Sequence, residues 1–369
     1  MGLFHQIGFK SHAVFYDSLR GNLNLKILIA GYFSAFWHEE AWCRSLIELG
    51  HEVIEFRIAP YFSSNILNKI QNRFLIGPII NRINSEFLSS IELNAPDIVL
   101  CYRALPFKPE TIQKIQDNHS LFTVSYNNDN IYGALKHKAY WRFFKKTIPL
   151  FDLNLVFRKD DINRYTRDNA KAVYHLYHHY LPWLHAGKEH VMSKLYKSDI
   201  CFLGHCEPDR RLGEMDSLMK EIPCRYSIHG SLWKENSKGH AWSGMDTHEL
   251  QGLDYVNCLV GSKIALAFYS TWNEDQYTTR SFEIPACGVF MLSQRTDEMM
   301  RLYEEDKEAV YFNDIDELID KAKFYLLNDH IREKIAIAGK NRCLNSGYDI
   351  YSRMREWISA AENIHGKFT

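Results

Sequence analysis

The sequence predicts an α/β protein built from two doubly wound domains that face each other across a cleft. Short apolar segments alternate with helix-like segments along most of the chain. That alternation is typical of parallel sheets covered by helices. The chain has 369 residues, more than one hydrophobic core usually organises, so two domains are expected.

The first half of the chain predicts one such domain. The apolar run at 25–30 (LKILIA) predicts a strand that ends at Gly31, and a helix-like stretch follows over about 37–49. Gly50 is suited to end that helix, and HEVIEFRI predicts the next strand. Further strands are predicted within 96–103, 121–129, 151–158 and 171–178. We expect the first domain to span residues 1–185.

The second half repeats the pattern. Strands are predicted within 198–203, 224–230, 262–270 and 289–294, and another begins at 309. A short helix is expected to begin at or just before Pro285, and an amphipathic helix follows the capping residue Asp314. We expect the second domain to span 186–345, with the boundary inside 181–198. Ligands of such folds bind between the carboxyl ends of the sheets.

The composition limits the partners and the compartment. Lys and Arg total 44 against 45 Asp and Glu, so the balance does not favour a nucleic-acid partner, although a local basic patch is not excluded. The eight cysteines are scattered and form no CxxC pair, which indicates buried free thiols in a reducing compartment. No segment has the length of a signal peptide core or of a membrane span. We expect a cytoplasmic protein, with attachment to the inner face of a membrane left open.

The segment 272–290 (WNEDQYTTRSFEIPACGVF) is the strongest candidate for a ligand site. Arg280 and Glu283 are three residues apart and therefore share one face of a short helix. Ala286 and Gly288 are small enough to let a ligand or another backbone approach. A nucleotide-sugar needs a carboxylate for ribose hydroxyls and a cation for the diphosphate. A solvated Arg–Glu pair on a surface helix is the alternative.

The segment 202–211 (FLGHCEPDRR) is a second candidate. A predicted strand ends at Gly204, and Arg210 and Arg211 follow at the start of a predicted helix. Two guanidinium groups near a helix N-terminus suit an anion. The segment contains neither GxGxxG nor a P-loop. An ordinary turn with surface arginines is the alternative.

Several of these segments together resemble a known family. The order FLG, the Gly-ended strand IHG (His229 and Gly230), SKIALAFYS, RSFEIPACGVFML and YSRMREW is similar to the CgeB-like glycosyltransferases. These belong to the GT-B class and carry a C-terminal domain of the glycosyl transferases group 1 type. The resemblance covers about 198–358 well and extends more weakly upstream. It implies two Rossmann-like domains, a donor site in the second domain that includes His229, Gly230 and Glu283, and a tail (346–369) that packs back on the first domain.

The resemblance also implies residues near the sugar. Group 1 transferases carry a Glu, seven residues and a second Glu, whereas this chain has Asp275 at the first position and Glu283 at the second. Asp275 is therefore a candidate catalytic residue, although its side chain is one methylene shorter. Trp272 and Asn273 of the same loop are further candidates for donor binding.

Candidates for the acceptor side lie in the first domain. The strand at 121–127 is followed by a polar cluster in which Asp129 is the candidate general base and Asn128 a candidate acceptor ligand. The loop after the first strand contains Tyr32 and Phe33 and two further aromatics, whose ring faces suit carbohydrate stacking. An Asx-rich turn and packing at the domain edge are the respective alternatives.

His175, His178, His179 and His185 gather at the end of the first domain. A metal site would need helical spacing and a carboxylate partner, so we expect these rings to support or line the cleft. GT-B enzymes as a class bind their donors without a metal. We therefore predict no metal and no cofactor, because the nucleotide-sugar is a substrate.

The leading hypothesis is an enzyme that transfers a hexose or pentose from a UDP-, GDP- or dTDP-sugar to an acceptor hydroxyl. Arg210, Arg211 and Arg280 would stabilise the departing diphosphate. The alternatives are a sugar-nucleotide epimerase or hydrolase on the same frame, and a non-catalytic sugar-binding scaffold. The sequence leaves open the stereochemical outcome, the oligomeric state and the acceptor. The acceptor could be a glycan, a lipid-linked glycan or another molecule.

Overall fold

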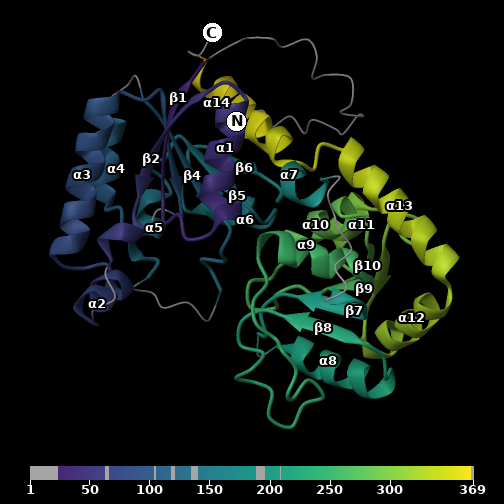
Figure 1. Cartoon of the computed structure of the whole chain (residues 1–369). Coiled ribbons are helices and arrows are strands. Elements are labelled where there is room, and N and C mark those ends of the chain that lie inside the picture. The colour runs from purple at the N-terminus through teal and green to yellow at the C-terminus, as the bar shows by residue number, and fades with distance from the viewer. Residues whose placement is uncertain are drawn as a thin grey trace.

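The computed structural model describes residues 24–62, 66–103, 105–117, 121–133, 140–187, 196–207 and 209–366. The first 23 residues of the predicted first domain, and residues 188–195 of the predicted boundary, lie outside the described residues. Figure 1 shows two α/β units, each a sheet flanked by helices. The prediction of two Rossmann-like parallel sheets is confirmed.

The N-terminal sheet has the order β2-β1-β3-β4-β5-β6 among the described residues, and every pairing is parallel. Strand β1 shows why its sequence is continuously apolar. Leu28 and Ala30 face one core, and Ile27 and Ile29 face the core on the other side, as expected for a sheet covered on both faces. The strands are β1 (Lys26–Gly31), β2 (Glu52–Arg57), β3 (Ile98–Tyr102), β4 (Phe122–Asn127), β5 (Leu153–Val156) and β6 (Val173–His175).

The C-terminal sheet has the order β11-β10-β9-β7-β8 in the described part of the chain, again with parallel pairings. In β7, Cys201 and Leu203 face one core while Ile200 and Phe202 face the other. All eight cysteines are free thiols, and seven of them are buried. The strands are β7 (Ser198–Leu203), β8 (Tyr226–His229), β9 (Ser262–Ala267), β10 (Phe290–Gln294) and β11 (Val310–Phe312).

Helices connect the strands and cover both sheets (Figure 1). The short helix α10 (Arg280–Ala286) begins five residues before Pro285, so the expectation that it starts at or just before this proline was wrong. Pro285 instead lies in the last turn of a helix too short to lose more than one backbone hydrogen bond to it. The other helices of the N-terminal unit are η1 (Phe36–Glu40), α1 (Ala41–Glu48), η2 (Ala59–Tyr61), α2 (Ile66–Phe74), α3 (Pro78–Asn94), α4 (Pro109–Gln116), α5 (Arg142–Thr147), α6 (Asp161–Arg167) and α7 (Pro182–His185). Those that follow are α8 (Arg210–Glu221), α9 (Gly252–Val260), α11 (Asp297–Leu302), α12 (Ile315–Leu327), α13 (Asp329–Asn345) and α14 (Ile350–His365).

The last helix returns to the first unit, drawn in yellow beside α1 in Figure 1. Asp349 caps the start of α14 by accepting a hydrogen bond from the backbone of Ser352. Further along, the ring of Trp357 stacks on Trp42 of α1, with centroids 6.4 Å apart and planes 15° apart. Both indoles are buried. Helices α1 and α14 therefore share one core.

We expect Trp357→Ala to destabilise the protein by about 3–5 kcal/mol, because it leaves a large cavity where α14 meets the N-terminal sheet. The free energy of unfolding in urea measures this loss. Phe324→Ala is a matched control, because Phe324 is half exposed on α12 and its truncation should cost much less. Equal losses for the two variants would contradict the anchoring role of α14.

Candidate active site

A cavity of about 260 Å³ lies between the two units, and both contribute its walls. Its lining follows the carboxyl ends of β1, β4, β7 and β8, which is where doubly wound sheets bind ligands. The N-terminal unit supplies Phe36, Trp37, His38, Asn128, His178, Leu184 and His185. The C-terminal unit supplies Leu203, Gly204, His205, His229, Gly230, Glu249, Leu250, Gln251, Gly252, Tyr255, Thr278, Thr279, Arg280 and Glu283.

Two glycines allow the strand ends to meet at this cavity. A Cβ on Gly230, which has a φ of +149°, would lie 2.1 Å from the carbonyl oxygen of Gly204. A Cβ on Gly204 would lie 2.8 Å from Nη1 of Arg280. Neither position has room for a side chain, so the backbone of β7, the backbone of β8 and the Arg280 guanidinium share one small volume.

Arg280 is the one Lys or Arg among the residues that line the cavity. Its guanidinium lies 5.5 Å from the centroid of the Phe202 ring, and its Nη2 donates to the carbonyl oxygen of Phe268 at 3.2 Å. Its Nε is buried and has no hydrogen-bond partner among the residues that the structure describes. A buried donor without a partner is costly, and a ligand oxygen would satisfy it.

Glu283 lies one helical turn after Arg280 and also faces the cavity. Tyr255 of α9 donates a hydrogen bond to its Oε2 at 2.7 Å, and Nε2 of His185 lies 4.0 Å from its Oε1. Burial raises the pKa of the Glu283 carboxyl, while the Tyr255 hydroxyl and the charge of Arg280 oppose that rise. The carboxylate is thus held in a fixed orientation at the cavity wall.

Two helices begin at the cavity. Gln251 and Gly252 open α9, and Thr278 and Thr279 precede α10; all four residues line the cavity. Neither helix has a side-chain cap among the described contacts. Backbone amides at helix N-termini attract anions. Together with Arg280, they make this wall suited to a negatively charged ligand.

Five of the predicted donor-binding residues line the cavity, namely Gly204, His229, Gly230, Arg280 and Glu283, whereas Arg210 and Arg211 do not. Arg210 is half exposed, and its Nε lies 3.5 Å from Oε1 of Glu214 on the same helix. Arg211 is buried and hydrogen-bonds to the backbone of His205 and to Asp209. These hydrogen bonds hold the loop after β7 in place. The sequence predicted that both arginines bind the donor, but neither of them lines the cavity.

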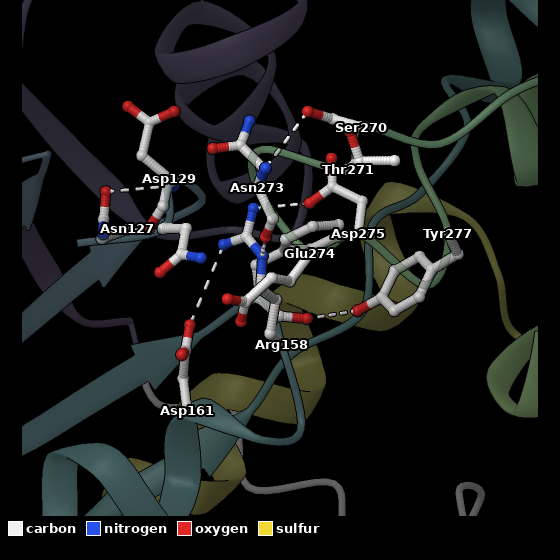
Figure 2. Close-up of polar contacts among 12 residues, drawn as sticks. Asn127, Asp129, Arg158, Asp161, Ser270, Thr271, Asn273, Glu274, Asp275 and Tyr277 are labelled. Carbon is white, nitrogen blue, oxygen red and sulfur yellow. Dashed lines mark hydrogen bonds and ion pairs between the residues drawn. The ribbon is translucent and has the colours of Figure 1, made fainter. Parts of the chain in front are cut away.

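Asp275 forms an ion pair with Arg158 across the two units (Figure 2). Nη2 of Arg158 donates to its Oδ1 at 2.5 Å, and Nε of Arg158 donates to the carbonyl oxygen of Asn273 at 2.6 Å. Arg164 adds a bond to Glu274 at 2.6 Å. Burial raises the pKa of Asp275 to about 6, against the opposing charge of Arg158. Asp275 and Asn273 hold the units together and are not among the residues that line the cavity.

Asp129 also lies beside the cavity wall and is paired. It bonds to Arg103, and its backbone amide donates to Oδ1 of Asn127 at 3.2 Å, in an Asx-type turn (Figure 2). Its neighbour Asn128 lines the cavity. The Asx turn that was the alternative interpretation is therefore present, and the general-base role of Asp129 stays a prediction.

The other predicted contacts, Tyr32, Phe33 and Trp272, are not among the residues that line the cavity. Tyr32 donates to Oδ1 of Asn72 at 3.0 Å, and Phe33 packs under the guanidinium of Arg57, 4.5 Å from its ring centroid. Phe33 has a φ of 53°, and this left-handed turn directs its side chain back toward β2. The two later aromatics of that loop, Phe36 and Trp37, line the cavity instead. Trp272 is 42% exposed and lies outside the cavity lining.

Among the cavity residues that the sequence did not indicate are His38, His205 and Tyr255. His205 directly follows Gly204, so its place after a strand end could have indicated it. His38 hydrogen-bonds to the Tyr102 hydroxyl at 3.1 Å, and burial lowers its pKa to about 4. Tyr255 belongs to α9, which follows a long loop with no clear pattern, so nothing local marked it.

The histidine cluster supports the interface between the units. Nε2 of His175 lies 3.0 Å from the Tyr277 hydroxyl and from the carbonyl oxygen of Phe157, whereas His178 and His185 line the cavity. Within the described ranges, no three His, Cys, Asp or Glu side chains converge as a metal site requires. The metal-independent reaction remains a prediction.

Comparison with known proteins agrees with this architecture. Residues 210–359 match a family model described as glycosyl transferase-like. No curated protein sequence matches the chain. Across the residues that the structure describes, no helix is long and apolar enough to pass through a bilayer.

Solved structures with the same fold cover nearly the whole chain. Anabaena Alr3699/HepE, in complex with UDP and glucose, aligns at a TM-score of 0.63 and 9% identity over 92% of this chain and 100% of that one. Sucrose-phosphate synthase from Thermosynechococcus elongatus aligns at 0.67 and 10% identity, over 92% and 99% of the chains. A putative UDP-N-acetylglucosamine 2-epimerase from Listeria monocytogenes aligns at 0.55 and 14% identity, over 94% and 98%. The chain has the GT-B fold, and the narrower CgeB-like resemblance stays a prediction.

Acid should destabilise the protein through its buried histidines. Burial lowers the pKa of His175 from 6.5 to about 4, so the unfolded chain takes up this proton first as the pH falls. The stabilisation is therefore fully present above about pH 6.5 and is lost as the pH falls toward 4, at about 1.4 kcal/mol per unit of lowered pKa. Urea unfolding at neutral pH and at about pH 5 measures the slope.

His175→Gln should reduce that slope, because glutamine cannot take up the proton. His248→Gln provides the control, because His248 is exposed on a loop. If His175→Gln and the unmodified protein lose stability equally between the two pH values, the assignment to His175 is wrong.

Proposed function

We propose that this chain is a glycosyltransferase that moves a sugar from a nucleoside-diphosphate sugar to an acceptor hydroxyl without a metal ion. The observation that carries the proposal is the meeting of Arg280 and Glu283 in a cavity walled by both units of a GT-B fold. A cation and a fixed carboxylate one helical turn apart match the two polar parts of such a donor, its diphosphate and its ribose.

Arg280 is the proposed partner of the diphosphate. Its Nε, which has no hydrogen-bond partner among the described residues, and the uncapped amides at the start of α9 provide donors for phosphate oxygens. In the reaction, the bond from the anomeric carbon to the diphosphate oxygen breaks and the acceptor oxygen bonds to that carbon. Negative charge accumulates on the leaving diphosphate, where fixed donors stabilise it most.

Glu283 is the proposed ligand of the ribose hydroxyls. Tyr255 occupies Oε2 of its carboxylate with a hydrogen bond, which leaves acceptor capacity on Oε1 for a hydroxyl donor. Gly204 and Gly230 keep the floor of the cavity free of side chains. Loss of the Tyr255 hydroxyl would free the carboxylate to rotate, so Tyr255 acts as a positioning residue.

The acceptor is proposed to enter from the N-terminal wall. Asn128 can donate and accept hydrogen bonds there, and Phe36 and Trp37 offer ring faces to a sugar. We assign Asp275 a positioning role through Arg158, since that ion pair joins the units on either side of the cleft. The closed cleft would exclude water, which competes with the acceptor for the donor. The proposal covers both hexosyl and pentosyl donors. The acceptor hydroxyl can belong to a glycan, to a lipid-linked glycan or to another molecule.

Substitution of Arg280 tests whether the nucleotide binds in the cavity or at the arginines outside it. We expect Arg280→Ala to weaken binding of UDP, GDP or dTDP by about 10- to 100-fold, because a hydrogen bond to a charged group contributes about 1.5–3 kcal/mol. Calorimetric titration with each nucleotide measures the change. Arg210→Ala, which removes an arginine outside the cavity, is the matched control and should bind as tightly as the unmodified protein. If Arg210→Ala weakens binding as much as Arg280→Ala does, the diphosphate lies elsewhere.

Turnover of donor alone tests the reaction. We expect slow release of nucleoside diphosphate and free sugar from one of the UDP-, GDP- or dTDP-sugars, because water can replace the missing acceptor at a low rate. Chromatography of the products measures this release, and Glu283→Ala should abolish it. Conversion of the donor to an isomer would instead favour an epimerase, and tight binding of all donors without turnover would favour a scaffold; either result contradicts glycosyl transfer.

A further inference from the structure

Helix α2 (Ile66–Phe74) presents its apolar side chains to solvent. Ile66 and Leu67 are 68% and 67% exposed, and Ile70 and Phe74 are also exposed. At 100° per residue these four positions fall within an arc of about 100° on the helix surface. The helix has no buried residue of its own. Together with Ile76, which is exposed just after the helix, they form one apolar stripe, called here the α2 stripe.

The opposite face of α2 is polar and points toward the protein. Oδ1 of Asn72 accepts a hydrogen bond from the Tyr32 hydroxyl at 3.0 Å, and Oε1 of Gln71 accepts one from the backbone of Ile79 at 3.0 Å. A surface helix of a globular protein ordinarily has the reverse arrangement, with its apolar face on the core. Polar anchoring with apolar exposure indicates that the α2 stripe serves a contact outside the molecule.

The charges of α2 and of one segment bonded to its C-terminal end are all of one sign. Residues 66–77 contain Lys69 and Arg73 and no Asp or Glu. The adjoining segment 140–150, whose Arg142 donates to the carbonyl oxygen of Leu75 at 2.5 Å, adds Lys145 and Lys146 and again no acidic residue. On a helical wheel, Lys69 and Arg73 flank one border of the stripe. Apolar side chains bordered by basic ones fit the interface of a bilayer with anionic headgroups.

We propose that α2 docks this protein on a lipid surface that carries anionic headgroups, with the α2 stripe inserted among the lipids. The helix lies at one end of the N-terminal unit (Figure 1). It contacts Tyr32, which directly follows β1, so it belongs to the same edge of the sheet as the cavity. Docking there would bring the N-terminal wall of the cavity close to the membrane surface. The inference rests on α2 and the basic segment beside it, and it holds whatever the donor is.

Sedimentation of the full chain with vesicles tests the proposal. We expect binding to vesicles of phosphatidylcholine and phosphatidylglycerol in equal parts, and much weaker binding to phosphatidylcholine alone. Leu67→Asn combined with Ile70→Asn should weaken binding by at least about tenfold, because each removes a side chain that the lipid would bury. Lys69→Gln should weaken binding to the anionic vesicles by about fivefold.

Leu93→Asn is the matched control, because Leu93 is 85% exposed on α3 of the same unit and lies outside the α2 stripe. It should bind vesicles as the unmodified protein does. Circular dichroism and thermal unfolding check that all variants remain folded, as expected for exposed positions. Absence of vesicle binding, equal binding to both vesicle types, or equal weakening by Leu93→Asn would each overturn the proposal. A dimer in sedimentation equilibrium that Leu67→Asn dissociates would also overturn it, since a second copy would then cover the stripe.

Discussion

The cleft depends on one guanidinium group. Arg158 of the N-terminal unit is almost fully buried, and it reaches across to bond the carbonyl oxygen of Asn273 and the carboxylate of Asp275. Removing Arg158 would leave the buried carboxylate of Asp275 without its cation, which is strongly unfavourable. The ion pair holds the two units at their spacing together with the contacts of Arg164 with Glu274 and of His175 with Tyr277. The cavity walls, which come from both units, are held apart at that spacing.

The cavity combines few charges with many oriented dipoles. Arg280 is the one guanidinium in its lining, and Gly204 lies so close to it that no side chain could intervene. In a partly enclosed site, fixed donors interact more strongly with an anion than they would in water. The histidines nearby add hydrogen-bonding groups without added positive charge, because burial lowers the pKa of His38, His178, His205 and His229. The anion-binding capacity of the wall is thus concentrated at Arg280 and the start of α9.

The two ends of the N-terminal unit have different roles. At one side, Trp357 and Trp42 bury the returning helix α14 in the core of the first sheet. At the other end, α2 is held by Asn72 and Gln71 and leaves its apolar side chains outside. The same physical effect, removal of apolar surface from water, stabilises the fold through α14 and leaves α2 available to a partner.

The sequence by itself determined the strands, the two-sheet architecture and the pairing of Arg280 with Glu283 on one helix face, because these follow from periodicity and short spacing. It could not assign Arg210, Arg211 or Asp275, because an arginine or an aspartate looks the same in a chain whether it meets a ligand or a neighbouring side chain. Their contacts appear only in the tertiary structure. Arg211 hydrogen-bonds to Asp209, and Asp275 pairs with Arg158, which lies 117 positions away in the chain. The tertiary structure also decided the contribution of Tyr255, since only folding brings α9 beside Glu283.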